Sequence, residues 1–173
     1  MKVDLERTPQ GLSRIQMDEE ASSLGLESEE GIFLSAVKVV LRINRRGDDF
    51  SLIGVITTTA ELECSRCLEA YPQKIETDFI LHIRRTDGKV MSPSDDFDED
   101  YVVVPRTMQR VDIGERVRQA VLLAFPVKPL CDPNCLGLCP HCGANRNEVH
   151  CQCQSEDSGE GWQVLRDLWQ DRS

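Results

Sequence analysis

Residues 33–63 read FLSAVKVVLRINRRGDDFSLIGVITTTAELE, and this stretch decides the fold. In its first part, apolar side chains recur at every second position: Val37, Val39, Leu41 and Ile43. That period places them on one face of a β-strand. The RRGDD segment has the residues of a turn, and the β-branched run after it is typical of a returning antiparallel strand. The stretch therefore predicts a β-hairpin.

Further strands are expected on both sides of this hairpin. YPQKIETDFILHIRR (71–85) predicts a third strand, and YVVVP (101–105) predicts a short one. Residues 1–31 favour an edge strand or two with loops. Three adjacent strands of this length imply a twisted antiparallel sheet, open or partly closed. The acidic stretch 92–100 is expected to be a solvated linker.

A helix is predicted over residues 112–125. Asp112 precedes Glu115 by three positions, as in an N-terminal capping arrangement, and Pro126 ends the pattern. The face expected to dock on the sheet carries Ile113, Val117, Ala120, Val121 and Ala124.

A short C-terminal helix is expected in GWQVLRDLWQ, with Trp162, Leu165 and Trp169 on one side. The fold class is therefore α+β. We expect three parts: a sheet domain with its packed helix over 1–126, a Cys-rich zinc-binding segment over 127–157, and the C-terminal helix over 158–173.

The composition limits the possible functions. The formal net charge is −10 and the pI is near 4.8, which disfavours a protein that coats nucleic acid unaided. The sequence has neither a run of roughly 18 apolar residues nor a secretory signal. We therefore expect a protein without membrane contact that stays in the cytoplasm, or in an organelle matrix if a transit peptide has been removed.

Cysteine is the most informative residue type. Six of the eight cysteines lie in CDPNCLGLCPHCGANRNEVHCQC (131–153), and the others form the pair Cys64 and Cys67. Cytoplasmic thiols stay reduced, so such clusters are more often metal sites than disulfides. Two Cys-x-x-Cys pairs have the spacing of zinc knuckles. The sequence predicts two structural zinc ions. An iron–sulfur cluster, disulfides or a redox dithiol are the less favoured alternatives.

The eight thiols divide into two groups of four. The short loop between Cys142 and Cys151 allows Cys139, Cys142, Cys151 and Cys153 to bind one ion. Cys64, Cys67, Cys131 and Cys135 would bind the other, although a different pairing stays open. His141 and His150 are expected to be bystanders, and His82 an ordinary strand residue.

Four thiolates leave no open coordination position, whereas a catalytic zinc needs one for water. The sequence also lacks the familiar hydrolase, phosphate-binding and dinucleotide-binding motifs. These observations favour a binding or assembly protein over an enzyme, with no catalytic residue and no small-molecule substrate.

Several segments in order resemble one family: ELECSRCLEAYPQKIETDF, the helix ending in LLAFPVKPLC, and CLGLCPHCGANRNEVHCQC. They are similar to the YceD family of large ribosomal RNA subunit accumulation proteins. The resemblance runs from about residue 30 to the end. It implies a role in producing or stabilising 23S ribosomal RNA and in assembling the large subunit, without an established active site. A zinc-ribbon adaptor in a transcription or quality-control complex is the alternative.

Two mechanisms would suit such a role. Arginine pairs at two strand ends could meet at one rim of the sheet and contact RNA phosphates. Alternatively, the acidic surface could hold a basic ribosomal protein. The candidate RNA-binding residues are Arg42, Arg45, Arg46, Arg84 and Arg85, with Lys89 as a further basic neighbour.

Overall fold

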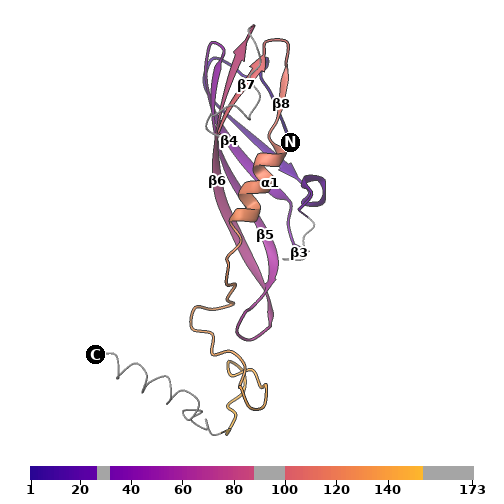
Figure 1. Ribbon diagram of the computed structural model, residues 1–173, viewed down its shortest axis with the longest axis vertical. Coiled ribbons are helices and arrows are strands. Elements are labelled where there is room, and N and C mark those ends of the chain that lie inside the picture. Colours follow the sequence, from indigo (N-terminus) through magenta and orange to yellow (C-terminus); the bar gives the residue numbers. More distant parts are fainter. Residues whose placement is uncertain (27–31, 88–99, 154–173) are drawn as a thin grey trace, which may run out of the picture. The chain divides into compact units, whose positions relative to one another are not determined.

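The structure is a computed structural model that describes residues 1–26, 32–87 and 100–153 (Figure 1). Its contacts divide the chain into two units. Unit 1 comprises residues 1–65 and 69–131, and unit 2 comprises residues 66–68 and those from 132 onward.

A six-stranded sheet forms the body of unit 1. The strand order is β2-β4-β5-β6-β7, with β3 beside β5, and all pairs are antiparallel except β6–β7. The strands are β2 (Gly11–Glu19), β3 (Ile32–Phe33), β4 (Val37–Arg46), β5 (Asp49–Glu63), β6 (Ala70–Thr86) and β7 (Tyr101–Pro105). The hairpin predicted from residues 33–63 is thus confirmed as β4–β5.

The sheet is open, which is one of the two forms expected from the sequence. One detail differs from the expectation of an antiparallel sheet, because β7 joins it parallel to β6. A parallel partner needs a long crossover connection, which the chain between residues 86 and 101 is long enough to supply. A second, two-stranded sheet pairs β1 (Lys2–Asp4) with β8 (Arg110–Asp112).

The side chains on one face of the large sheet form most of the hydrophobic core. The four alternating residues of β4, from Val37 to Ile43, are all fully buried, as their period predicts. Helix α1 (Gly114–Leu123) lies over the sheet and buries Val117 and Val121 (Figure 1). The short 3-10 helix η1 (Ser22–Leu24) adds Leu24 to the same core. The predicted class of a sheet with one packed helix therefore holds.

The start of α1 differs slightly from the prediction. The helix begins at Gly114, and the carboxylate of Asp112 accepts a hydrogen bond of 2.8 Å from the Gly114 N–H. This bond lowers the pKa of Asp112. The predicted capping box with Glu115 does not form, because Ile113 occupies the N-cap position and has no side chain that accepts a hydrogen bond.

Unit 2 is built from turns rather than from long strands in its described part. A single bridge pairs Leu138 with Asn145, and Gly137 and Gly143 have positive φ angles. The predicted helix over 158–173 and nearly all of the predicted linker over 92–100 lie outside the described residues. In the described part of the chain, no helix is both long and apolar enough to span a membrane.

Candidate metal centres

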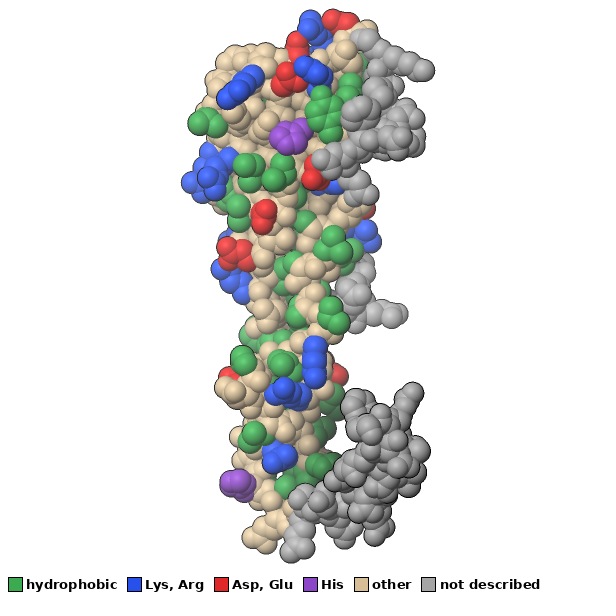
Figure 2. Space-filling view, turned by 60° about the vertical axis from the view of Figure 1, so that its left-hand side comes forward, with side chains coloured by type: hydrophobic (Ala, Val, Ile, Leu, Met, Phe, Trp, Pro, Cys, Tyr) green, Lys and Arg blue, Asp and Glu red, His purple; other side chains and the backbone are tan. Residues whose placement is uncertain are grey.

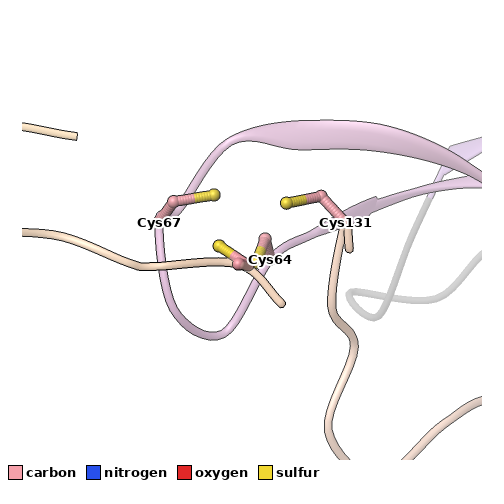
Figure 3. Close-up of side chains that lie close together, drawn as sticks. Cys64, Cys67 and Cys131 are labelled. Atoms are coloured by element: carbon pink, nitrogen blue, oxygen red, sulfur yellow. The ribbon is translucent and has the colours of Figure 1, made fainter. Parts of the chain in front are cut away.

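The first cysteine group joins the turn between β5 and β6 to the segment after α1. Cys64 and Cys67 lie in the turn, and Cys131 and Cys135 follow the helix. Their four sulfur atoms lie within 4.8 Å of one another, and Figure 3 shows the three labelled cysteines converging. Three of the four are buried, and Cys131 is exposed.

Backbone geometry holds the turn in place. The N–H of Cys64 donates to Glu69 O at 2.9 Å, and that of Ser65 donates to Pro129 O at 2.9 Å. Leu68 has a φ of 61°, a left-handed conformation that is rare outside glycine. These contacts fix the direction of the turn.

Arg66, between the two cysteines of the turn, fixes the segment that carries Cys135. Its guanidinium donates to Pro133 O at 3.2 Å and to Cys135 O at 2.8 Å, and its own carbonyl accepts from the Leu138 N–H at 3.0 Å. A Cβ on Gly137 would lie 3.0 Å from that carbonyl, so glycine is needed there. Arg66 was not among the residues predicted from the sequence, although its place inside a Cys-x-x-Cys pair was an available signal.

The second group consists of Cys139, Cys142, Cys151 and Cys153, and its sulfur atoms also lie within 4.8 Å of one another. The Cys139 N–H donates to Ala144 O at 2.8 Å, and the Gly143 N–H donates to Cys139 O at 2.9 Å. These bonds form the tight loop expected of a metal knuckle.

Hydrogen bonds shift the pKa values of two cysteines in the second group in opposite directions. The backbone N–H groups of Cys142 and His141 lower the pKa of Cys139 to about 6. A hydrogen bond with the Cys142 side chain raises the pKa of Cys153 to about 12. The loop therefore favours a thiolate at Cys139, and a bound cation would have to displace the proton of Cys153.

Both groups fit a closed four-thiolate metal site. In a tetrahedral zinc site with Zn–S bonds of about 2.3 Å, neighbouring sulfur atoms are roughly 3.8 Å apart. Separations of up to 4.8 Å need only small side-chain rotations to reach this value. An all-sulfur set suits zinc and also iron–sulfur clusters, so the geometry supports a soft metal without identifying it.

Asn147 connects the two groups within unit 2. Its Nδ2 donates to the sulfur of Cys135 at 3.2 Å and to Asn145 Oδ1 at 2.8 Å. Its Oδ1 accepts from the Leu136 N–H at 2.8 Å. A residue from the loop of the second group thus orients a cysteine of the first.

The histidines lie outside both groups of four sulfur atoms. His141, His150 and Arg146 line a cavity of about 230 Å³ beside the second group. His82, on β6, shares a hydrogen bond of 3.1 Å with Ser51 Oγ.

The five candidate RNA-binding arginines do not form one surface. Alternate residues of a strand point to opposite faces, so Arg42, Arg46 and Arg84 lie on the open face, away from the core. Arg45 and Arg85 lie on the other side. The two strand ends do meet at one rim of the sheet, as expected, because Arg46 and Arg84 are both paired with Asp49, but the arginine side chains are divided between its two faces. Lys89 lies outside the described residues.

Three of these arginines already have partners. Arg45 donates to Thr8 O at 2.6 Å and lies over the Phe50 ring, 5.0 Å from its centroid. Arg85 donates to Arg106 O. Arg84 pairs with Asp49 at 2.9 Å. Arg42 and Arg46 remain exposed and form no ion pair with a described residue.

The open face is mixed in character. Ile53 and Ile80, which are paired across β5 and β6, are 44% and 43% exposed. Arg14 lies opposite Arg42 across β2 and β4, a neighbour that the sequence analysis missed. Figure 2 shows hydrophobic, basic and acidic side chains interspersed on one face of the molecule.

The sequence matches the profile of one protein family. Residues 52–169 match the profile described as large ribosomal RNA subunit accumulation protein YceD. The chain belongs to the YceD family. The matched stretch contains all eight cysteines, so the resemblance seen in the sequence is confirmed.

Curated relatives of this YceD chain occur in plants and mycobacteria. It is 26% identical to the chloroplastic YCED homolog 1 of Arabidopsis thaliana over 91% of the chain and 58% of the relative. It is 30% identical to the chloroplastic YCED homolog 1 of Zea mays over 68% of the chain and 48% of the relative. An uncharacterized Mycobacterium tuberculosis protein is 27% identical over 60% of the chain and 48% of that relative.

The chain spans about half the length of these relatives. No solved structure matches it significantly.

Proposed function

We propose that this protein supports the accumulation of large-subunit ribosomal RNA as a non-enzymatic binding factor. The family match carries this proposal, because it covers the stretch with both cysteine groups. The role is the one for which the two plant relatives are named. Closed four-thiolate sites suit a scaffold, since they leave no coordination position for a substrate.

Each cysteine group would hold one structural zinc ion. The lowered pKa of Cys139 and the buried sulfurs of Cys64, Cys67 and Cys135 support this assignment, because zinc binds thiolates and is retained where water is excluded. The first ion would join chain segments more than sixty residues apart and so remove much entropy from the unfolded chain.

Contact with the RNA would use the basic residues of the open face. Arg42 and Arg46 have no ionic partner among the described residues, so their guanidinium groups are available to phosphates. Arg84 would have to exchange Asp49 for phosphate, and Arg45 and Arg85 would give up carbonyl partners. Action through a large-subunit ribosomal protein stays the second mechanism. A cytoplasmic location and the three-part division of the chain also stay predictions.

Depletion tests the role itself. Cells that lack the protein should show a lowered ratio of 23S to 16S ribosomal RNA, and the intact gene should restore it. A gene with Arg42→Glu and Arg46→Glu should restore it poorly, whereas Lys74→Glu, on the same face, should restore it fully. An unchanged ratio in a clean deletion would argue against the proposal and favour an adaptor in another complex.

Crosslinking in cells tests the mechanism. Sequencing of crosslinked RNA and mass spectrometry of crosslinked proteins should recover large-subunit precursor RNA with the wild-type protein. Recovery of a ribosomal protein without RNA would support the indirect mechanism instead.

A further inference from the structure

The outer edge of β2 has no partner strand among the described residues. β2 ends the order of the large sheet and pairs with β4 alone. Described residues outside that pairing make no backbone hydrogen bond to Gly11–Glu19. An unpaired strand edge offers a row of N–H and C=O groups to which another strand can add.

The charged residues of β2 indicate which kind of strand the free edge would bind. Arg14 lies directly opposite Arg42, and both are exposed without an ion pair to a described acidic residue. Like charges in this position destabilise a sheet. Acidic side chains beside the free edge would relieve the repulsion. Asp18, on the same face of β2, lies opposite Lys38.

We propose that β2 pairs antiparallel with β2 of a second copy of this chain, in the register centred on Gln16. Arg14 of each copy then lies opposite Asp18 of the other, and Ile15 lies opposite Met17. Ile15 and Met17 are partly buried and pack against the core, so the apolar row continues across the junction. This inference is independent of the proposed function.

Other registers that keep the same faces together match less well. Centring the pairing on Ile15 places Arg14 opposite Gln16, without an opposite charge. Centring it on Arg14 or Asp18 makes like charges meet. Centring it on Met17 places Ile15 opposite Glu19. Among these registers, only the one centred on Gln16 places opposite charges opposite each other and apolar residues opposite each other.

The symmetry has a consequence for the open face. Antiparallel pairing of identical strands creates a two-fold axis perpendicular to the sheet, which is an isologous contact. The open faces of both copies then lie on the same side of one continuous sheet. Arg14, Arg42 and Arg46 of each copy would contribute to a single basic surface.

Charge reversal tests this pairing in the full-length, metal-loaded protein. Sedimentation velocity over a range of concentrations should show a dimer for the wild type. Asp18→Arg and Arg14→Asp should each raise the dissociation constant about tenfold, since two like-charge pairs replace two opposite-charge pairs. The double variant should return to within about threefold of wild type. Asp78→Arg, on β6 of the same face, is the matched control and should change nothing.

Gln16→Glu provides a second test that leaves the fold intact. Gln16 is exposed, and its replacement places two carboxylates opposite each other only in the dimer. It should weaken association while thermal unfolding followed by circular dichroism stays unchanged. A monomeric wild type at every concentration would overturn the proposal, as would a dimer that resists both single reversals. A monomer whose Arg14→Asp variant loses bound RNA would assign the edge to RNA instead.

Discussion

At Gly54 the sheet has no room for a side chain, because the ring of Phe79 lies over it from the neighbouring strand. A Cβ at this position would lie 2.2 Å from the nearest ring carbon. The two residues are direct partners between β5 and β6. The glycine therefore lets an aromatic ring complete a core that is poor in aromatic residues.

Gly54→Ala should lower the free energy of unfolding by about 2 kcal/mol, because the added methyl group displaces the Phe79 ring. Chemical denaturation measures the change. Phe79→Leu in the same chain should recover part of the loss, and this double-mutant comparison isolates the clash. Simple additivity of the two losses would show that the ring and the glycine are not coupled.

The second cysteine group should release its metal in acid, because protonation of Cys139 removes one ligand. A zinc ion in this group would bind the thiolate of Cys139, which is fully present well above a pKa of about 6 and is lost as the pH falls through it. Because Cys153 has a raised pKa and is already protonated, zinc affinity should fall with pH across the neutral range, and it should fall most steeply below about pH 6, where Cys139 also takes up a proton. A colorimetric zinc indicator measures release, and Cys139→Ser should already have lost the ion at pH 7. Release that does not vary with pH would contradict this assignment.

At the scale of elements, α1 shows how a short helix is held by packing rather than by its caps. Its N-cap residue Ile113 makes no side-chain cap hydrogen bond, and the only side-chain acceptor at its start among the described residues is Asp112. Val117 and Val121 are buried, while Leu123 on the opposite side is 86% exposed. An isolated helix of this length is marginal in water, so contact with the sheet supplies its stability.

Val121→Ala should lower the free energy of unfolding by about 2 kcal/mol, because it leaves a cavity between α1 and the sheet. Leu123→Ala on the same helix removes a larger side chain from an exposed position and should change the free energy by less than about 0.5 kcal/mol. Denaturation of both variants gives the comparison. Equal losses would mean that the helix is not docked as described.

At the scale of the whole molecule, the two cysteine groups should contribute differently to stability. The first joins the turn after β5 to the segment after α1. The second closes a loop within unit 2. A constraint across a long stretch of chain removes more unfolded-state entropy than a local one.

Elemental analysis should find two zinc equivalents per chain in the wild type and about one after Cys64→Ser or Cys151→Ser. Cys64→Ser should lower the melting temperature of the sheet, whereas Cys151→Ser should disturb mainly residues 139–153. Hydrogen exchange locates each effect. Equal global unfolding by both substitutions would refute this difference, and folded wild-type protein without metal would refute the scaffold role.

Local patterns in the sequence determined much of this structure. The period of two from Val37 to Ile43 identified β4 and its buried face, and loop length separated the eight thiols into the groups of four that the structure brings together. The strand pattern and the second cysteine group depend on residues close in the chain, where covalent geometry limits what can meet, and the first group followed from the four thiols that were left.

Only the tertiary structure decided how separate segments meet. The position of Phe79 over Gly54, the pairing of Arg14 with Arg42 and the bond from Asn147 to Cys135 depend on register and packing between distant residues. The same register divided the predicted arginine rim between two faces. A shift of one residue in strand pairing reverses every side chain, and no local pattern in a single strand specifies the position of its neighbour.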